Sequence, residues 1–120
     1  MSKSKYYYDF DRNKDMSEKP EERKKMPVYT GVLKYFPDAM FEVSKCSYAG
    51  QKQHNPDKPL HWDRDKSGDE LDALTRHLIE AGKIDTDGVR HSAKVAWRAL
   101  ANLQKELENE KKRRGIVWGL

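Results

Sequence analysis

Apolar residues recur at helical spacing in three stretches of the chain, and each stretch predicts a helix. The first helix is expected over residues 37–49, with Pro37 in its first turn and Gly50 ending it. The second is expected over residues 67–82 and the third over residues 88–112. The chain is therefore expected to be all-α, a small helical domain of three main helices.

The apolar stripes of the second and third helices predict how these helices pack. The first of these stripes comprises Leu71, Leu74, Leu78 and Ile79, and the second comprises Val89, Ala93, Ala96, Leu100, Leu103 and Leu107. We expect the two stripes to pack against each other in an antiparallel pair. Ser67 and Glu70 have the spacing of a capping box, in which each side chain bonds a backbone amide of the other's turn.

The remaining segments are predicted to be an arm, a long loop and a tail. Residues 1–30 are expected to form a flexible arm, highly charged but for the aromatic cluster Tyr6–Phe10. The stretch Tyr29–Phe36 is compatible with a short strand or an extended entry segment. Residues 51–66 contain two prolines and no periodicity, so they predict a long loop, a kind of segment that often carries function.

Composition limits the size of the core and the classes of partner. The 120 residues are 36% hydrophobic and 37% charged, so we expect a small core. Apolar segments such as Ile116–Leu120 are then expected to be buried in the interface of a homo-oligomer. The net charge of +4, without a long block of one sign, argues against a dedicated duplex-DNA binder. One cysteine, Cys46, excludes an intrachain disulfide. With no signal-type or transmembrane apolar run, a soluble intracellular protein is expected.

Cationic, imidazole and indole side chains gather between residues 52 and 98. Guanidinium and ammonium groups hold phosphates by charge-assisted hydrogen bonds, and a ring such as Trp62 or Tyr48 stacks on a base. The polar side chains of any one helix are compatible with an ordinary solvated face. The joint occurrence of cations, imidazoles and indoles predicts a site for a phosphorylated, base-bearing ligand. The residues expected to bind it are Lys52, His54, Trp62, Arg76, His77, Arg90, His91 and Arg98. As a surface residue, Arg98 is expected to matter for binding and little for stability.

The sequence patterns for a metal site are weaker than those for a phosphorylated ligand. Asp69 and Asp72 have a spacing at which two carboxylates share a divalent cation. The run from Asp85 to Gly88 resembles the start of a calcium loop, but its twelfth position is Ala96 rather than the required glutamate. The paired acidic motifs of all-helical nucleotide pyrophosphohydrolases are also missing. Four histidines and one cysteine make no recognisable zinc pattern.

Several short runs, in order, resemble a known family. They include His54-Asn-Pro, Pro59-Leu-His-Trp62, Arg76-His-Leu78, Asp85-x-Asp-Gly88, Arg90-His91 and Ala96-Trp-Arg-Ala-Leu100. Over about residues 38–108 the chain resembles the phage and prophage dATP/dGTP diphosphohydrolase N-terminal domain. The resemblance implies release of diphosphate from purine deoxynucleoside triphosphates, in larger proteins of which this domain is one part. Many members of the family have a histidine at the position of Lys94 and an asparagine at that of Arg98; two cations there favour phosphate binding over metal binding.

Two main hypotheses follow, and binding is favoured over catalysis. In the first, a phage protein binds and sequesters a nucleotide or nucleotide-derived signal in the cytoplasm of its bacterial host, as an anti-defence candidate without a cofactor. In the second, a diphosphohydrolase-like enzyme uses Mg²⁺ or Mn²⁺, with His77 or His91 handling protons. Its metal ligands would be Asp69, Asp72, Asp85 and Asp87. A third, less favoured hypothesis is a nucleic-acid binder, which a steep salt dependence would mark.

Overall fold

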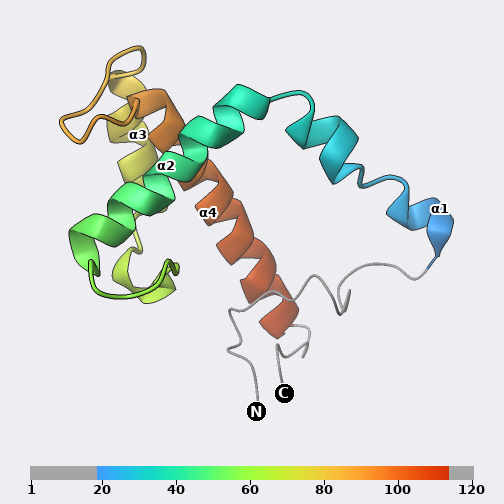
Figure 1. Ribbon diagram of the computed structural model, residues 1–120. Coiled ribbons are helices and arrows are strands. Elements are labelled where there is room, and N and C mark those ends of the chain that lie inside the picture. Colours follow the sequence, from blue (N-terminus) through green and yellow to red (C-terminus); the bar gives the residue numbers. More distant parts are fainter. Residues whose placement is uncertain (1–18, 114–120) are drawn as a thin grey trace.

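The computed structural model describes residues 19–113, which form helices joined by loops (Figure 1). In chain order the elements are α1 (Pro20–Arg23), a π-helical turn η1 (Tyr29–Leu33), α2 (Pro37–His54), a 3₁₀ turn η2 (Arg64–Lys66), α3 (Glu70–Ile79) and α4 (His91–Arg113). Extended pairing within these residues is limited to one isolated bridge, Ile84 to Arg90. The all-α prediction is therefore confirmed. No helix in this part of the chain is long and apolar enough to cross a lipid bilayer.

Helix α2 runs past Gly50 and ends at His54, so the predicted stop at Gly50 is wrong. The helix end is held one turn later, where the amide of Asn55 donates to the carbonyl oxygen of Gln51 at 2.9 Å. The side chain of Gln51 also donates to the carbonyl oxygens of Asn55 and Lys58. These bonds satisfy the helix end, and the long loop consequently covers residues 55–69.

Helix α3 begins at Glu70 without the predicted capping box. Asp69 is the N-cap residue and makes no side-chain capping bond, while the Ser67 hydroxyl donates to the Asp69 carboxylate at 3.2 Å. Glu70 is only 4% exposed and accepts hydrogen bonds from Arg98 at 2.7 Å and Lys105 at 2.8 Å. A buried carboxylate requires cationic partners more than it requires a backbone amide, so Glu70 turns towards α4.

Helix α3 lies antiparallel to the first half of α4, and α2 crosses α4 (Figure 1). The buried apolar residues are small or β-branched: Val43, Ala73, Val89, Ala93 and Ala101. By contrast, the leucines of the predicted stripes other than Leu74 are 44–58% exposed and Ile79 is 77% exposed. The predicted antiparallel pairing of α3 and α4 is confirmed, and Val89 and Ala93 of the predicted stripe are buried, but the prediction that the leucines form the contact is wrong for all except Leu74. The contact is made by alanines, which let the helices approach closely, and by ion pairs.

The segment before α2 extends away from the three-helix body (Figure 1). Tyr29–Leu33 is helical, so the strand or extended segment predicted there is wrong. The structure covers residues 19–30 of the predicted arm and forms the short α1 there. Tyr6–Phe10 and Ile116–Leu120 lie outside the described residues, and the flexibility of the arm stays a prediction.

Candidate functional site

A cavity of about 780 Å³ lies between the C-terminal half of α2, the 55–69 loop and the first half of α4. This volume is within the usual range for small-molecule sites. The side chains that line the cavity and carry chemistry are His54, His61, Trp62, Asp63, Lys66, Asp69, His77, Asp87, Lys94, Trp97 and Arg98. The cavity therefore combines indole rings, imidazoles and cations with a few carboxylates.

Two indoles form one wall of this cavity. The rings of Trp62 and Trp97 lie 5.7 Å apart, edge to face at 74°. The Trp97 ring nitrogen donates to the Ser47 hydroxyl at 2.9 Å, which fixes this ring against α2. Partly exposed, oriented indoles are suited to contact with a planar base.

The loop that carries Trp62 is tied to α4 by a buried ion pair. Arg64 donates two hydrogen bonds to Glu108, at 3.0 and 2.9 Å, and Glu108 is only 2% exposed. The Arg64 guanidinium also lies 4.1 Å from the centre of the Trp62 ring. Since Glu108 additionally accepts from Gln104 at 2.9 Å, its carboxylate is well satisfied. The pair positions the aromatic wall.

Two cations in the cavity retain donors for a ligand. Arg98 bonds Ser67 at 2.9 Å and Glu70 at 2.7 Å, in both cases through Nη1. A guanidinium has five N–H groups, and the Nε and Nη2 donors of Arg98 make no hydrogen bond to the described residues. Lys66 lines the cavity and is exposed, and its ammonium makes no ion pair with residues 19–113.

Glu70 stays ionised beneath Arg98. Burial alone would raise the pKa of Glu70, but hydrogen bonds from Lys105 and Arg98 outweigh burial and hold the pKa below its ordinary value. Arg98 therefore has a structural role as well as a place in the cavity, which corrects the expectation that it matters little for stability.

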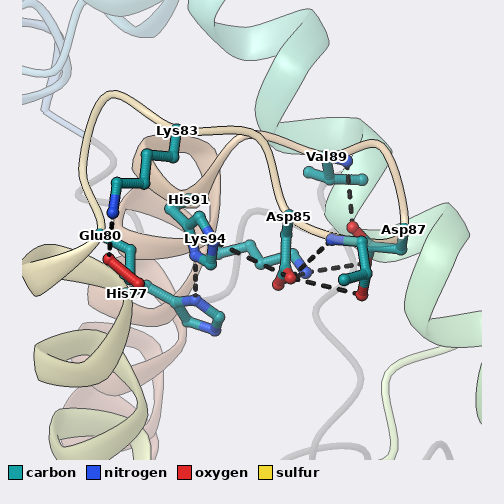
Figure 2. Close-up of polar contacts among 9 residues, drawn as sticks. His77, Glu80, Lys83, Asp85, Asp87, Val89, His91 and Lys94 are labelled. Carbon is teal, nitrogen blue, oxygen red and sulfur yellow. Dashed lines mark hydrogen bonds and ion pairs between the residues drawn. The ribbon is translucent and has the colours of Figure 1, made fainter.

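Lys94 joins the two carboxylates of the loop between α3 and α4 (Figure 2). Its ammonium lies 2.7 Å from an oxygen of Asp85 and 2.7 Å from one of Asp87. The bond from Lys94 lowers the pKa of Asp85 to about 2. Although burial alone would lower the pKa of Lys94, its bonds to both carboxylates raise it. A permanent ammonium thus occupies the point between these two carboxylates.

His77 of α3 and His91 of α4 meet beside this group (Figure 2). Their Nδ1 atoms lie 2.9 Å apart, and Nε2 of His91 lies 3.8 Å from Asp85. Burial, together with the nearby charge of Lys94, lowers the pKa of His77, so its ring is neutral at neutral pH.

The structure brings together four of the eight residues predicted to bind the ligand. The residues that line the main cavity are His54, Trp62, His77 and Arg98. The other four do not line it. Lys52 lines a second cavity of about 760 Å³ beside Tyr48, Arg76 is exposed and paired with Asp69 at 3.0 Å, Arg90 is exposed at the start of α4, and His91 lies behind His77.

The four predicted metal ligands do not form one group. Asp85 and Asp87 are joined through Lys94, whereas Asp69 is paired with Arg76 and Asp72 is exposed on α3. The geometry instead places Asp85 with two histidines, as described above. The role of the four predicted aspartates as metal ligands stays a prediction.

Among the cavity residues that carry chemistry, those not predicted to bind a ligand are His61, Asp63, Lys66 and Trp97. A signal for Trp97 existed, because an indole four residues after Ala93 lies on the buried side of α4. For Lys66 the decisive information is how the 55–69 loop packs against α4, which no local pattern specifies.

The comparison with known families shows to which family the chain belongs. The sequence model described as dATP/dGTP diphosphohydrolase, N-terminal, matches residues 16–114. The chain belongs to this family. The matched residues include every residue of the cavity. The resemblance to the dATP/dGTP diphosphohydrolase N-terminal domain, inferred from the short sequence runs, is confirmed. No curated protein and no solved structure matches the chain.

Proposed function

We propose that the main cavity of this domain binds a phosphorylated nucleotide and holds it without hydrolysing it. Support comes first from the lining, in which two indoles lie beside cationic side chains. The base would contact the indole wall of Trp62 and Trp97. The phosphates would lie towards Lys66 and Arg98, whose remaining donors form charge-assisted bonds with anionic oxygens.

The observation that favours binding over hydrolysis is the position of Lys94. A metal-dependent hydrolase requires two or more carboxylates that converge on divalent cations beside the substrate. In this domain the neighbouring carboxylates of Asp85 and Asp87 are bridged by the Lys94 ammonium at 2.7 Å from each. An ammonium there takes the place of the cation that would activate water.

Family membership favours a second candidate, a diphosphohydrolase-like enzyme that uses Mg²⁺ or Mn²⁺. One experiment separates the two. The chain is incubated with dATP, dGTP, ATP and GTP, with and without Mg²⁺ or Mn²⁺, and the mixture is chromatographed before and after denaturation. Intact nucleotide recovered only after denaturation supports binding. A monophosphate product supports the enzyme, and no retained nucleotide in any arm refutes the proposal.

The phosphate contact is tested by Lys66→Ala, with Lys58→Ala as a matched control on the same loop but outside the cavity lining. Lys66→Ala should raise the Kd for the retained nucleotide roughly fivefold, because an exposed ion pair contributes about 1 kcal/mol at most. Lys58→Ala should leave the Kd unchanged. Equal Kd values for both variants would contradict this placement of the phosphates.

The wider setting is also a proposal. We infer that the domain comes from a phage, acts in the cytoplasm of the bacterial host and sequesters a nucleotide or nucleotide-derived signal, as an anti-defence protein would. We further infer a homo-oligomer, because α3 and α4 leave several leucines half-exposed, among them Leu71, Leu78 and Leu103. The same leucines of a second copy are partners of matching chemistry.

A further inference from the structure

A group of three metal-ligating side chains lies beside the cavity, which only His77 of the three also lines, and none of the three is among the residues assigned to the nucleotide. One nitrogen each from His77 and His91 and one oxygen of Asp85 lie within 4.8 Å of one another. The three side chains come from three segments, α3, the start of α4 and the loop between them (Figure 2). From this geometry we propose that His77, Asp85 and His91 bind a transition-metal ion such as Zn²⁺.

The distances between ligand atoms are close to those that one ion requires. Zinc lies about 2.0–2.2 Å from nitrogen and oxygen ligands, so two ligands of one ion are at most roughly 4.2 Å apart. The two Nδ1 atoms lie 2.9 Å apart, and Nε2 of His91 lies 3.8 Å from the Asp85 carboxylate. These two distances involve different nitrogens of His91. With one atom from each residue the three ligand atoms lie within 4.8 Å of one another, so the side chains turn slightly inward when the ion binds.

The segment that carries Asp85 is held in place by its own backbone. The amide of Asp85 donates to the carbonyl oxygen of Val89 at 2.9 Å, and the amide of Gly88 donates to that of Asp85 at 2.9 Å. Gly88 has φ +82°, a left-handed conformation that favours glycine. The amide of His91 donates to the carbonyl oxygen of Lys83 at 3.1 Å. The ligands therefore start from a fixed frame, which lowers the entropic cost of binding an ion.

Neighbouring groups orient the Asp85 carboxylate. One oxygen of Asp85 accepts from Lys94, while the other accepts from the Thr86 amide at 2.7 Å and faces His91. Partners of this kind orient metal ligands in known sites.

The ligand set indicates which metals the site takes. Two imidazole nitrogens and one carboxylate favour Zn²⁺, Co²⁺, Ni²⁺ or Fe²⁺ over Mg²⁺ and Ca²⁺, which prefer oxygen ligands. Three protein ligands also leave a coordination position for water or a ligand oxygen. This site differs from a carboxylate-only magnesium centre in both residues and metal class.

The experiment is a calorimetric titration of the full chain, without a histidine tag, with Zn²⁺ alone and with Mg²⁺ alone. One Zn²⁺ per chain should bind, and Mg²⁺ should give no comparable heat. His77→Gln and His91→Gln should each weaken Zn²⁺ binding at least tenfold, about the smallest loss seen when only a partner of a metal ligand is changed. His61→Gln, on the exposed loop, is the matched control and should bind as the unaltered chain does.

Two outcomes would overturn the proposal: no Zn²⁺ binding by the unaltered chain, or equal Zn²⁺ affinity in all three histidine variants. If His77→Gln or His91→Gln fails to fold, imidazole NMR of the unaltered chain decides instead. Added Zn²⁺ should then shift the ring signals of His77 and His91 and leave those of His54 and His61 in place. Shifts confined to His54 and His61 would refute the site.

Discussion

Replacing Arg98 by alanine tests whether the buried charge network holds α3 to α4. The substitution removes the hydrogen bonds from Arg98 to Glu70 and Ser67 and the contact of its guanidinium with the Trp97 ring. Glu70 is 4% exposed and keeps Lys105 as its one cationic partner, at 2.8 Å. The network is therefore weakened rather than abolished.

The magnitude follows from that remaining partner. Leaving a buried charge without any partner costs about 3–5 kcal/mol, whereas losing one hydrogen bond to a charged group costs about 1.5–3 kcal/mol. Since Lys105 stays, we expect the free energy of unfolding to fall by about 2–3 kcal/mol for Arg98→Ala. For a domain of this size, each kcal/mol corresponds to roughly 4–8 °C in Tm.

The assay is urea unfolding followed by far-UV circular dichroism, in a double-mutant cycle with Glu70→Gln. In the Glu70→Gln background, Arg98→Ala should cost less than about 1 kcal/mol, because a neutral amide needs the guanidinium far less. The control is Arg90→Ala at an exposed position, which should stay within about 0.5 kcal/mol of the unaltered chain. Equal costs of Arg98→Ala in both backgrounds would refute the coupling between Arg98 and Glu70.

Three further predictions concern acid stability, the loop anchor and assembly. Lys94 depresses the pKa of Asp85 to about 2, so the stability that this pair contributes is present above about pH 4 and lost as pH falls towards about 2. In an acid titration followed by circular dichroism, Lys94→Gln should remove the loss of stability between these two pH values. An unchanged titration would contradict the role of Lys94. Glu108→Gln should lower the free energy of unfolding in urea by about 1.5–3 kcal/mol, while Glu106→Gln at an exposed position of the same helix should not; equal effects would rule out the buried Arg64–Glu108 pair as the cause. Light scattering should give a mass above the 14.1 kDa of one chain, and Leu103→Glu should return it to one chain; a monomer at micromolar concentration in the unaltered chain would contradict the oligomer.

The helices could be predicted from local patterns, whereas their contacts could not. Periodicity placed α2, α3 and α4 correctly to within a few residues, because each amphipathic stretch carries its own signal. The same patterns placed Val89 and Ala93 in the core correctly, but they also assigned most of the leucines there, whereas the structure buries Ala73, Ala101 and two glutamates. Apolar size alone does not predict which face of a helix is buried when ion pairs join two helices.

The candidate site shows the same division. His54 and Trp62 were recognised together because both fall in residues 51–66, a stretch rich in functional residue types that was predicted to be one loop, although His54 ends α2. Whether His77 or Arg76 faces the cavity depends on the rotation of α3, and the burial of Glu70 against α4 sets that rotation. The bond from Arg64 to Glu108 was not predictable, since 44 residues separate the two and neither belongs to a recognisable motif.

That same bond has a consequence for the order in which the chain folds. The contact between His77 and His91 closes a segment of 14 residues, whereas the contact between Arg64 and Glu108 closes one of 44. Shorter loops cost less entropy to close, so the α3–α4 hairpin is the expected nucleus and the 55–69 loop docks on it later. The aromatic wall of the cavity is then the last part to be assembled, and the first to open when the folded chain fluctuates.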